Sequence, residues 1–421
     1  MDLQKIIDQV SKKKLNVSDL LDSLVKDAFQ RKASDIHIEA KEDDNLLIRY
    51  RIDGILRDII TIGNNLEESL IFIVKVRAKL RTDIRFAPQD GKIVFKINSG
   101  KSTKTKKNKP DSYDVDGRVS ILPVTYGEKV VIRLLSQANR SFGLIDLGLE
   151  SSDLAKVEKS YKEPYGLILA TGPTGSGKTT TLYSILKILN TRDVNITTIE
   201  DPVEYGIEGV NHIQINPKGD LTFANGLRSI LRQDPDIIMV GEIRDTETAR
   251  ITVNSALTGH LVLSTLHAND AMSTIPRLLD MGIESFLIAS TVNIIITQRL
   301  ARRLCPHCKV QYTVGKDSEH KDSLKLRPDL QKYLSSKDKL FKAVGCSKCD
   351  NTGYSGRIGI YEILHMNKEL RNLIINGYNN EDLLSTAQKY GFKLMIEDGI
   401  HKLKEGIIDI TELMKVIAIK E

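Results

Sequence analysis

The spacing of apolar residues changes twice along this chain of 421 residues. The first 30 residues place apolar side chains at helical intervals among charged ones. Alternating apolar and polar positions then predict strands between residues 33 and 60 and again between 91 and 135, on either side of a stretch at 66–80 with helical spacing. We therefore expect an N-terminal helical segment (1–30) followed by a smaller α+β domain (31–136).

Beyond residue 163 the pattern becomes one of short apolar strands separated by helical segments. The strand candidates are YGLILATG, NITTIEDP, DIIMVGE and HLVLSTLH. Such alternation is typical of a parallel sheet with crossover helices. We expect an α/β core at 164–303 after a linker and hinge at 137–163 that includes one short helix. A cysteine-flanked section (304–358) and a helical C-terminal region (359–421) complete the chain.

Composition narrows the class of protein only a little. The net charge of +6 is mild for this length, and it permits contact with acidic lipid or nucleic acid without favouring either. No apolar run reaches the roughly 18 residues that a membrane helix needs, and the charged N-terminus is unlike a signal peptide, so we expect a cytoplasmic protein. The lysine-rich segment 98–112 is interpreted as a solvated hairpin tip, with a lipid- or acid-binding loop as the alternative.

The segment GPTGSGKT, between an apolar strand and a helix, matches the phosphate-loop pattern G-x-x-x-x-G-K-[ST]. Glycines allow the backbone to turn through conformations that side chains forbid, so that N–H groups surround a phosphate. Lys178 can then reach the β- and γ-phosphates, and the Thr179 hydroxyl can ligate Mg²⁺. The predicted nucleotide-binding residues are Gly172, Pro173, Thr174, Gly175, Ser176, Gly177, Lys178, Thr179 and Thr180.

Phosphoryl transfer also needs an acid at the end of a neighbouring strand. The segment PDIIMVGEIRD supplies Glu242 where Asp is usual, and this carboxylate can hold magnesium through water, orient the attacking water, or do both. A second acidic group, comprising Glu200, Asp201 and Glu204, ends the preceding strand. We expect Glu200 to assist catalysis and Glu204 to contact the nucleotide, with a surface turn as the alternative for this group.

The segment TGHLVLSTLHAND places His260 and His267 at the two ends of one strand. His267, at the carboxyl end, is expected to face the same crevice as the phosphates, where ligands of α/β sheets bind. We also assign His260 to nucleotide binding. For either histidine, a packed or capping role is the alternative.

The cysteines form two C-x-x-C pairs, Cys305 with Cys308 and Cys346 with Cys349. Two such pairs separated by a long insert predict a tetrahedral Cys₄ zinc site, which is structural because no position is left open. Two redox pairs are the alternative. The absence of cysteine upstream of residue 300 fits a reducing compartment.

These motifs, in this order, resemble the secretion ATPases of type II secretion and type IV pilus assembly (GspE/PilB-like). In that family GPTGSGKTT is the Walker A motif, ITTIEDPVEY the aspartate box, DIIMVGEIRD an atypical Walker B and TGHLVLSTLHAND the histidine box. The upstream segments ASDIHIEA, RYRIDG, APQDGKI and GRVSILPVTYGEKVVIRLL resemble its N-domain. The resemblance implies a RecA-like ATPase domain after a PAS-like N-domain.

The resemblance also implies partners and further site residues. Arg118 and Arg133 match N-domain arginines that reach the γ-phosphate, whereas interface ion pairs would equally explain Arg244 and Arg299. The family implies a homohexamer at the cytoplasmic face of the inner membrane that uses ATP, Mg²⁺ and Zn²⁺. Its expected partners are an inner-membrane platform protein and a recruitment protein of the pilus or secretion machine.

Three other functions are weighed against this one. Pilus retraction ATPases share the nucleotide motifs but typically lack the tetracysteine section, which favours assembly. A nucleic-acid motor also uses a RecA-like sheet, but the aromatic content is 5%, Trp is absent, and no basic stripe is laced with aromatic residues. A scaffold that binds ATP without hydrolysing it conflicts with the full set of acidic and histidine positions.

Overall fold

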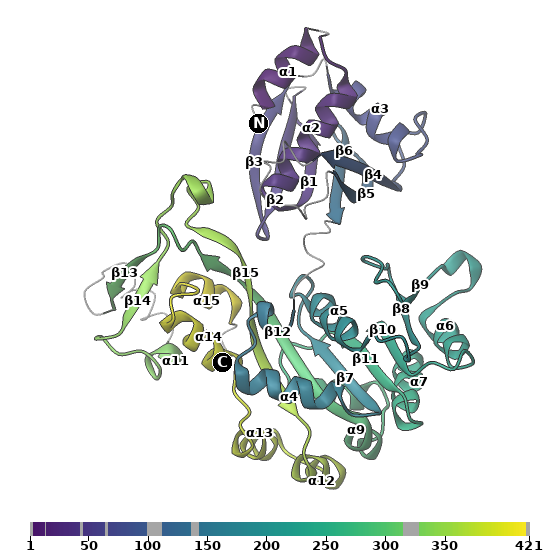
Figure 1. Ribbon diagram of the computed structural model, residues 1–421, viewed down its shortest axis with the longest axis vertical. Helices are drawn as coiled ribbons and strands as arrows, with labels where there is room; N and C mark the ends of the chain where they lie inside the picture. The colour runs from purple at the N-terminus through teal and green to yellow at the C-terminus, as the bar shows by residue number, and fades with distance from the viewer. Residues whose placement is uncertain are drawn as a thin grey trace. The chain divides into compact units, whose positions relative to one another are not determined.

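The computed structural model describes residues 3–12, 14–42, 45–63, 66–98, 112–135, 143–314 and 328–417. The chain divides into two compact units, Met1–Ser141 and Phe142–Glu421, and each is considered by itself (Figure 1). The lysine-rich segment 98–112 lies almost entirely outside the described residues. Among the described residues, no helix has the length and apolar character needed to cross a membrane.

The first unit is an α+β domain built on one antiparallel sheet. Its six strands lie in the order β3-β2-β1-β6-β5-β4. The strands are β1 (Ala33–Ala40), β2 (Leu46–Ile52), β3 (Ile55–Ile62), β4 (Gln89–Asn98), β5 (Ser112–Val124) and β6 (Gly127–Leu135). The helices are α1 (Leu3–Ser11), α2 (Val17–Gln30) and α3 (Glu67–Arg77), as the helical spacing at 1–30 and 66–80 predicts.

One face of this sheet is apolar and the other is charged. Strand positions such as Ile36 and Ile38 alternate with Asp35, and the isoleucines join the core formed with the helices. On the other face Asp35 lies opposite Arg133 of β6, which in turn lies opposite Arg118 of β5. The two arginines that the family resemblance singles out are therefore direct cross-strand neighbours.

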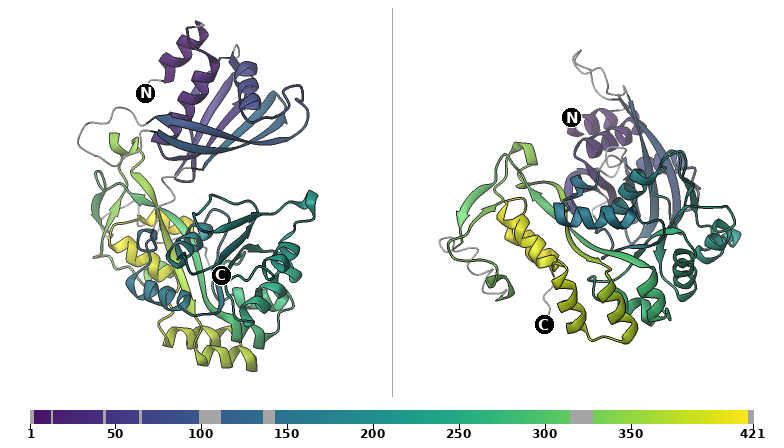
Figure 2. Two further views of the ribbon diagram at one scale, coloured as in Figure 1. Left: turned by 45° about the vertical axis from the view of Figure 1, so that its right-hand side comes forward. Right: turned by 60° about the horizontal axis from the view of Figure 1, so that its bottom comes forward.

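The second unit contains a seven-stranded sheet in the order β15-β12-β7-β11-β10-β8-β9, and only the β12–β15 pair is antiparallel (Figures 1 and 2). The strands are β7 (Gly166–Thr171), β8 (Ile196–Glu200), β9 (Asn211–Gln214), β10 (Ile237–Ile243), β11 (Leu261–Leu266), β12 (Val292–Leu304) and β15 (Tyr354–His365). Strands β7, β8, β10 and β11 confirm the four strand candidates, and the mixed α/β architecture confirms the expected fold class. The PAS-like character of the N-domain stays a prediction.

Helices cover both faces of this sheet. The apolar core on one side includes α4 (Ser151–Tyr161) and α5 (Lys178–Leu189). The core on the other side includes α6 (Phe223–Ile230), α7 (Thr246–Leu257), α8 (Thr274–Asp280), α9 (Ser285–Thr291), α12 (Lys368–Asn376) and α13 (Asn380–Lys389). Every residue of β7 and β11 is buried, and this burial on both faces explains why most of their residues are apolar.

The C-terminal region differs in part from the expectation. Residues 359–365, expected to be helical, belong to β15, because they pair along β12 and are buried against it. Beyond the sheet this β12–β15 ribbon carries a core shared with α14 (Met395–Lys404) and α15 (Ile410–Val416). A short hairpin of β13 (Val310–Thr313) and β14 (Lys339–Lys342), together with α11 (Pro328–Gln331), lies near the cysteines in sequence.

Candidate nucleotide site

The phosphate loop connects the end of β7 to the start of α5. Its three glycines all take positive φ: 135° at Gly172, 78° at Gly175 and 92° at Gly177. These are backbone conformations that favour glycine, and they allow successive N–H groups to point into one concavity. The N-terminus of α5, which begins at Lys178, adds its partial positive charge at the same place.

Two of these glycines are also needed because they pack so closely against β12 that no side chain would fit. A β-carbon at Gly172 would lie 2.4 Å from the backbone oxygen of Gln298, and one at Gly177 would lie 2.9 Å from the Nε2 atom of Gln298. At Gly175 a β-carbon would meet nothing within 4 Å. The motif therefore combines two different requirements: a turn at all three glycines, and space for a neighbouring strand at two of them.

Gln298 is a site residue that the sequence reasoning missed. Its side chain is buried, with Nε2 donating to the Ser176 carbonyl at 2.7 Å and Oε1 accepting from the Thr181 hydroxyl at 2.7 Å. One strand position earlier, the Thr297 hydroxyl hydrogen-bonds to that of Thr171, the last residue of β7. The available signal was a threonine and a glutamine that directly follow three consecutive isoleucines in the segment NIIITQRL. These contacts hold the phosphate loop from its sheet side.

Lys178 lies on the first turn of α5 with its ammonium inside the loop. Its Nζ donates to the carbonyls of Gly172 at 2.7 Å and Pro173 at 3.1 Å. Burial lowers the pKa of Lys178, and the charge of Glu242 opposes that shift. The lysine is therefore held at the loop and close enough to Glu242 to feel its charge. Thr179 and Thr180 follow on the same turn and are half-buried.

Glu242, at the carboxyl end of β10, lies between a cation and a histidine. Its Oε2 atom is 2.7 Å from Nε of Arg244 and 3.5 Å from Nε2 of His267. The hydrogen bond to Glu242 raises the pKa of Arg244. The structure thus places Glu242 and His267, which were predicted from two different segments, beside each other. Arg244 forms an ion pair with Glu242 at the same place.

Glu200, at the carboxyl end of the adjacent strand β8, is buried, and both of its carboxylate oxygens accept hydrogen bonds. It accepts hydrogen bonds from the Tyr183 hydroxyl, from the Thr198 hydroxyl at 2.6 Å and from Nδ1 of His212 at 2.9 Å. His212 Nε2 accepts from the Ile207 backbone N–H at 3.0 Å, so the network assigns the imidazole proton to Nδ1. This carboxylate is fixed in place rather than free to rotate.

Tyr183 and His212 were likewise missed by the sequence reasoning. Burial, followed by the negative charge of Glu200, raises the pKa of Tyr183, so the hydroxyl stays protonated and remains a donor. The Tyr183 ring also packs edge-on against Tyr205, with ring centroids 4.8 Å apart. A tyrosine on the apolar face of α5 gave no signal that distinguished it from an ordinary core residue.

His260 does not reach this edge of the sheet. It precedes β11 beside Gly166 at the start of β7, whereas the phosphate loop begins after Thr171 at the other end. Its Nδ1 atom lies 3.0 Å from the Ser255 carbonyl oxygen, which makes it the donor in a local hydrogen bond. Because six strand residues span about 20 Å, a nucleotide on the phosphate loop of the same unit is out of its reach.

The remaining predicted residues belong to other elements of the two units. Glu204 is half-buried in the turn after β8, and Arg299 is half-buried on β12 next to Gln298. Arg133 belongs to the first unit, where its Nε atom lies 3.1 Å from Asp35. A contact between Arg118 or Arg133 and a γ-phosphate would join the two units, and it stays a prediction.

The four cysteines converge as their spacing predicts. Their sulfur atoms all lie within 4.8 Å of one another, with Cys305–Cys346 at 3.9 Å and Cys308–Cys349 at 3.8 Å. A tetrahedron with metal–sulfur bonds of about 2.3 Å has edges of about 3.8 Å, so this cluster fits one four-coordinate ion. Although burial acts in the opposite sense, backbone amides of Cys346 and Gly353 lower the pKa of Cys349 to about 6.

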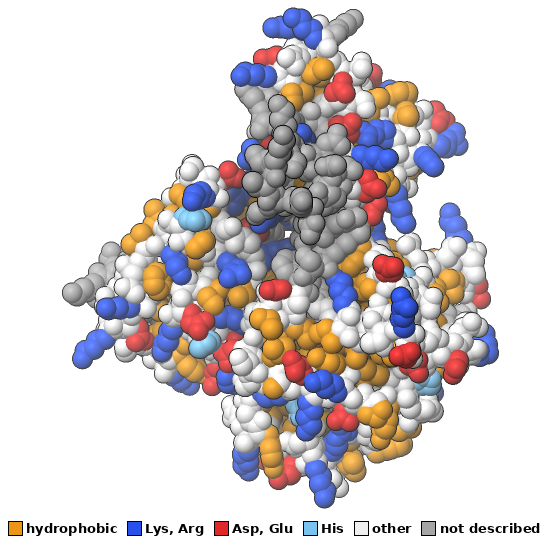
Figure 3. All heavy atoms as spheres, viewed as in Figure 1, with side chains coloured by type: hydrophobic (Ala, Val, Ile, Leu, Met, Phe, Trp, Pro, Cys, Tyr) orange, Lys and Arg blue, Asp and Glu red, His pale blue; other side chains and the backbone are white. Residues whose placement is uncertain are grey.

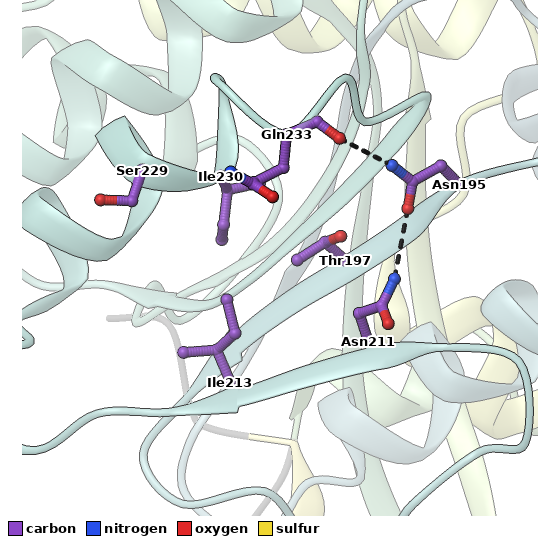
Figure 4. A pocket seen from close by; sticks show the side chains of 7 residues that line it. All are labelled: Asn195, Thr197, Asn211, Ile213, Ser229, Ile230 and Gln233. Carbon is purple, nitrogen blue, oxygen red and sulfur yellow. Dashed lines mark hydrogen bonds between the residues drawn. The ribbon is translucent and has the colours of Figure 1, made fainter.

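A cavity of about 430 Å³ lies elsewhere in this unit, between α6 and the amino ends of β8 and β9 (Figure 4). Its lining is formed by Asn195, Thr197, Asn211, Ile213, Ser229, Ile230 and Gln233. Figure 4 shows the carboxamides of Asn195 and Asn211 hydrogen-bonded to each other. Because Glu200 is at the opposite end of β8, this cavity is not the nucleotide site.

The two glycine requirements make different predictions for alanine substitutions. Gly172→Ala should lower ATP affinity at least about 100-fold, since the new methyl group overlaps the Gln298 backbone, which cannot move away from the sheet. Gly175→Ala carries only the strain of a positive φ, about 1 kcal/mol, and should lower affinity less than about tenfold. Titration with a fluorescent ATP analogue measures both, and equal losses would contradict the packing argument.

Comparisons with known proteins agree with this geometry. The family model for "Type II/IV secretion system protein" matches residues 10–415. The type IV pilus assembly ATPase PilB of Myxococcus xanthus is 43% identical over 400 residues, covering 94% of this chain and 67% of that protein. The type II secretion system protein HxcR of Pseudomonas aeruginosa is 41% identical over 428 residues, covering 99% and 82%. The type II secretion system ATPase E of Vibrio cholerae is 43% identical over 398 residues, covering 94% and 74%.

Solved structures show the same architecture. The pilus retraction motor PilT with bound ADP has a TM-score of 0.59 at 25% identity, covering 94% of this chain and 96% of its own. The DotB ATPase of Legionella pneumophila has a TM-score of 0.64 at 21% identity, covering 93% and 94%, and shows the fold alone. With the family model spanning nearly the whole chain and a phosphate loop beside two acidic strand ends, the chain belongs to the type II/IV secretion system protein family and is an ATPase of that family.

Proposed function

We propose that this chain is the motor ATPase that couples ATP hydrolysis to pilin or pseudopilin assembly in a type IV pilus or a type II secretion machine. One observation carries the proposal: the glycine cradle lies beside the Glu242–Arg244–His267 group in a chain that is 43% identical to a type IV pilus assembly ATPase and 43% identical to a type II secretion system ATPase. The tetracysteine cluster favours assembly over retraction.

The phosphate loop and its surroundings supply the parts that hydrolysis needs. The loop amides and Lys178 hold the β- and γ-phosphates, and Thr179 offers its hydroxyl to Mg²⁺, which when bound neutralises phosphate charge. Lys178 would exchange its contacts with the loop carbonyls for contacts with phosphate oxygens. This arrangement lowers the barrier by placing positive charge where negative charge develops.

Glu242 is proposed to position the attacking water. Its carboxylate is half-buried and pairs with Arg244, and it would accept a hydrogen bond from the attacking water. His267 lies on the same side and is half exposed, which suits a residue that senses the γ-phosphate. Glu200 assists as a second negative charge, fixed by Tyr183 and His212.

The working assembly is proposed to be a homohexamer at the cytoplasmic face of the inner membrane. Arg118 and Arg133, as neighbours on the charged face of the N-domain sheet, would supply positive charge to the γ-phosphate. The partners would be an inner-membrane platform protein and a recruitment protein of the machine. Nucleic acid is not expected as a partner: on the described part of the face in Figure 3, acidic and basic side chains are interspersed.

Steady-state turnover tests the enzymatic core of this proposal. Lys178→Ala and Glu242→Gln should each lower ATP turnover at least about 100-fold, because they remove charge stabilisation and water positioning respectively. Glu242→Gln should still bind ATP. The matched control is Glu247→Gln on α7, an exposed glutamate with the same change of charge. Normal turnover by Glu242→Gln would disprove its assigned role.

The cysteine cluster is proposed to hold Zn²⁺ in a structural role. Four thiolates with no open position suit zinc, and the amide donors to Cys349 favour its thiolate form. Elemental analysis of protein purified without added metal should find one zinc per chain. Cys346→Ser combined with Cys349→Ser should lose that zinc and lower the melting temperature. Iron in place of zinc, or a full melting temperature without metal, would contradict this assignment.

A further inference from the structure

A buried carboxylate on β15 joins two segments that are distant in sequence. Glu362 is 3% exposed. Its Oε1 atom accepts a hydrogen bond from the Ala271 backbone N–H at 2.8 Å, and its Oε2 atom accepts one from the Met395 backbone N–H at 3.2 Å. Each of these contacts joins one carboxylate oxygen to the backbone of a different segment, so this one side chain restrains both segments.

The first of these segments follows the histidine strand. Ala271 is fully buried and lies four residues after His267. Around Ala271 the loop is closed on itself, because the Ser273 N–H donates to the Asp270 side chain at 2.7 Å. The side chain of His267 is half exposed and has Glu242 within 3.5 Å. The buried amide of Ala271 is therefore an anchor for the loop that carries His267.

Strand pairing places Glu362 next to the residues of β12 that hold the phosphate loop. Glu362 lies directly opposite Thr297 on β12, and Thr297 bonds to Thr171 at the end of β7. Gln298, the next residue along β12, holds the phosphate loop itself. One ribbon of two strands thus fixes both loops, the phosphate loop from β12 and the histidine loop from β15.

We propose that Glu362 is a positioning residue for ATP hydrolysis, which holds the histidine loop through the Ala271 amide so that His267 stays beside Glu242 at the γ-phosphate. This inference rests on the role of His267 in the proposed function. The second hydrogen bond connects the same carboxylate to the first residue of α14, so docking of that C-terminal helix and placement of the histidine loop share one side chain.

Glu362→Gln tests the proposal with little change of shape. The new amide group can accept only through its oxygen, so one of the two backbone N–H groups faces an NH₂ group and loses its acceptor. We expect kcat to fall about tenfold, the scale of one buried N–H group left without its acceptor, with KM for ATP within about twofold because the phosphate loop is untouched.

The control is Glu397→Ala, which removes a backbone-to-carboxylate hydrogen bond at the start of the same helix. Glu397 accepts a hydrogen bond from the Leu394 N–H at 2.8 Å, and no hydrogen bond in the described part of the chain ties its carboxylate to the histidine loop. It should keep its kcat while showing a similar change in melting temperature. Equal losses of kcat in the two variants would mean that Glu362 acts only by stabilising α14 and would overturn the inference.

A double-mutant cycle with His267→Ala separates this inference from the proposed function. If Glu362 acts through the histidine loop, Glu362→Gln should cause no further loss of kcat once His267 is gone. Full turnover by His267→Ala alone would overturn the role of His267 and this inference with it. A slow His267→Ala enzyme combined with normal kcat for Glu362→Gln would overturn the inference alone.

Hydrogen exchange of the wild-type protein tests whether the contact between Ala271 and Glu362 forms in solution, even if Glu362→Gln does not fold. The Ala271 amide should exchange as slowly as the amides of β11, because it is buried and bonded. Exchange as fast as in exposed loops would show that the anchor is not formed in solution.

Discussion

The contact between β12 and the phosphate loop is the constraint on which the rest of the second unit depends. Gln298 occupies the space that side chains at Gly172 and Gly177 would take, and its carboxamide holds the loop through Ser176. The loop can therefore keep its concave shape without a bound phosphate, since its glycines provide the turns and its neighbour provides the support. Because the loop already has its binding conformation, it loses less conformational entropy when ATP binds.

Glu200 at the end of β8 and Glu242 at the end of β10 are held differently, and this difference suggests different roles in hydrolysis. Glu200 is buried among Tyr183, Thr198 and His212, so its position is fixed. Glu242 has one cation and one histidine beside it and keeps a partly open face. A carboxylate that accepts a hydrogen bond from the attacking water needs that open face. A carboxylate that contributes only to the electrostatic potential of the site does not.

The sequence predicted those features whose chemistry depends on local spacing. The phosphate loop, the strand ending at Glu242 and the two cysteine pairs all lie in short motifs, and the four apolar strands are continuous runs. Gln298, Tyr183, His212 and Glu362 were missed because the polar partners that give them their roles lie 12 to 122 residues away along the chain. His260 precedes β11 at the amino end of that strand, about one strand length from the phosphate loop of the same unit, and its assignment to nucleotide binding gains no support from this position. Residues 359–365 were expected to be helical because nothing local shows that they pair with β12.

The most direct test of the account is made in cells. The gene is deleted and complemented with wild type or with Lys178→Ala, and surface fibres and secreted proteins are compared. The account predicts that deletion abolishes either the fibres or the secretion, and that only the wild-type chain restores what was lost. Fibres and secretion that both persist after deletion would contradict the claim that this ATPase drives pilin or pseudopilin assembly.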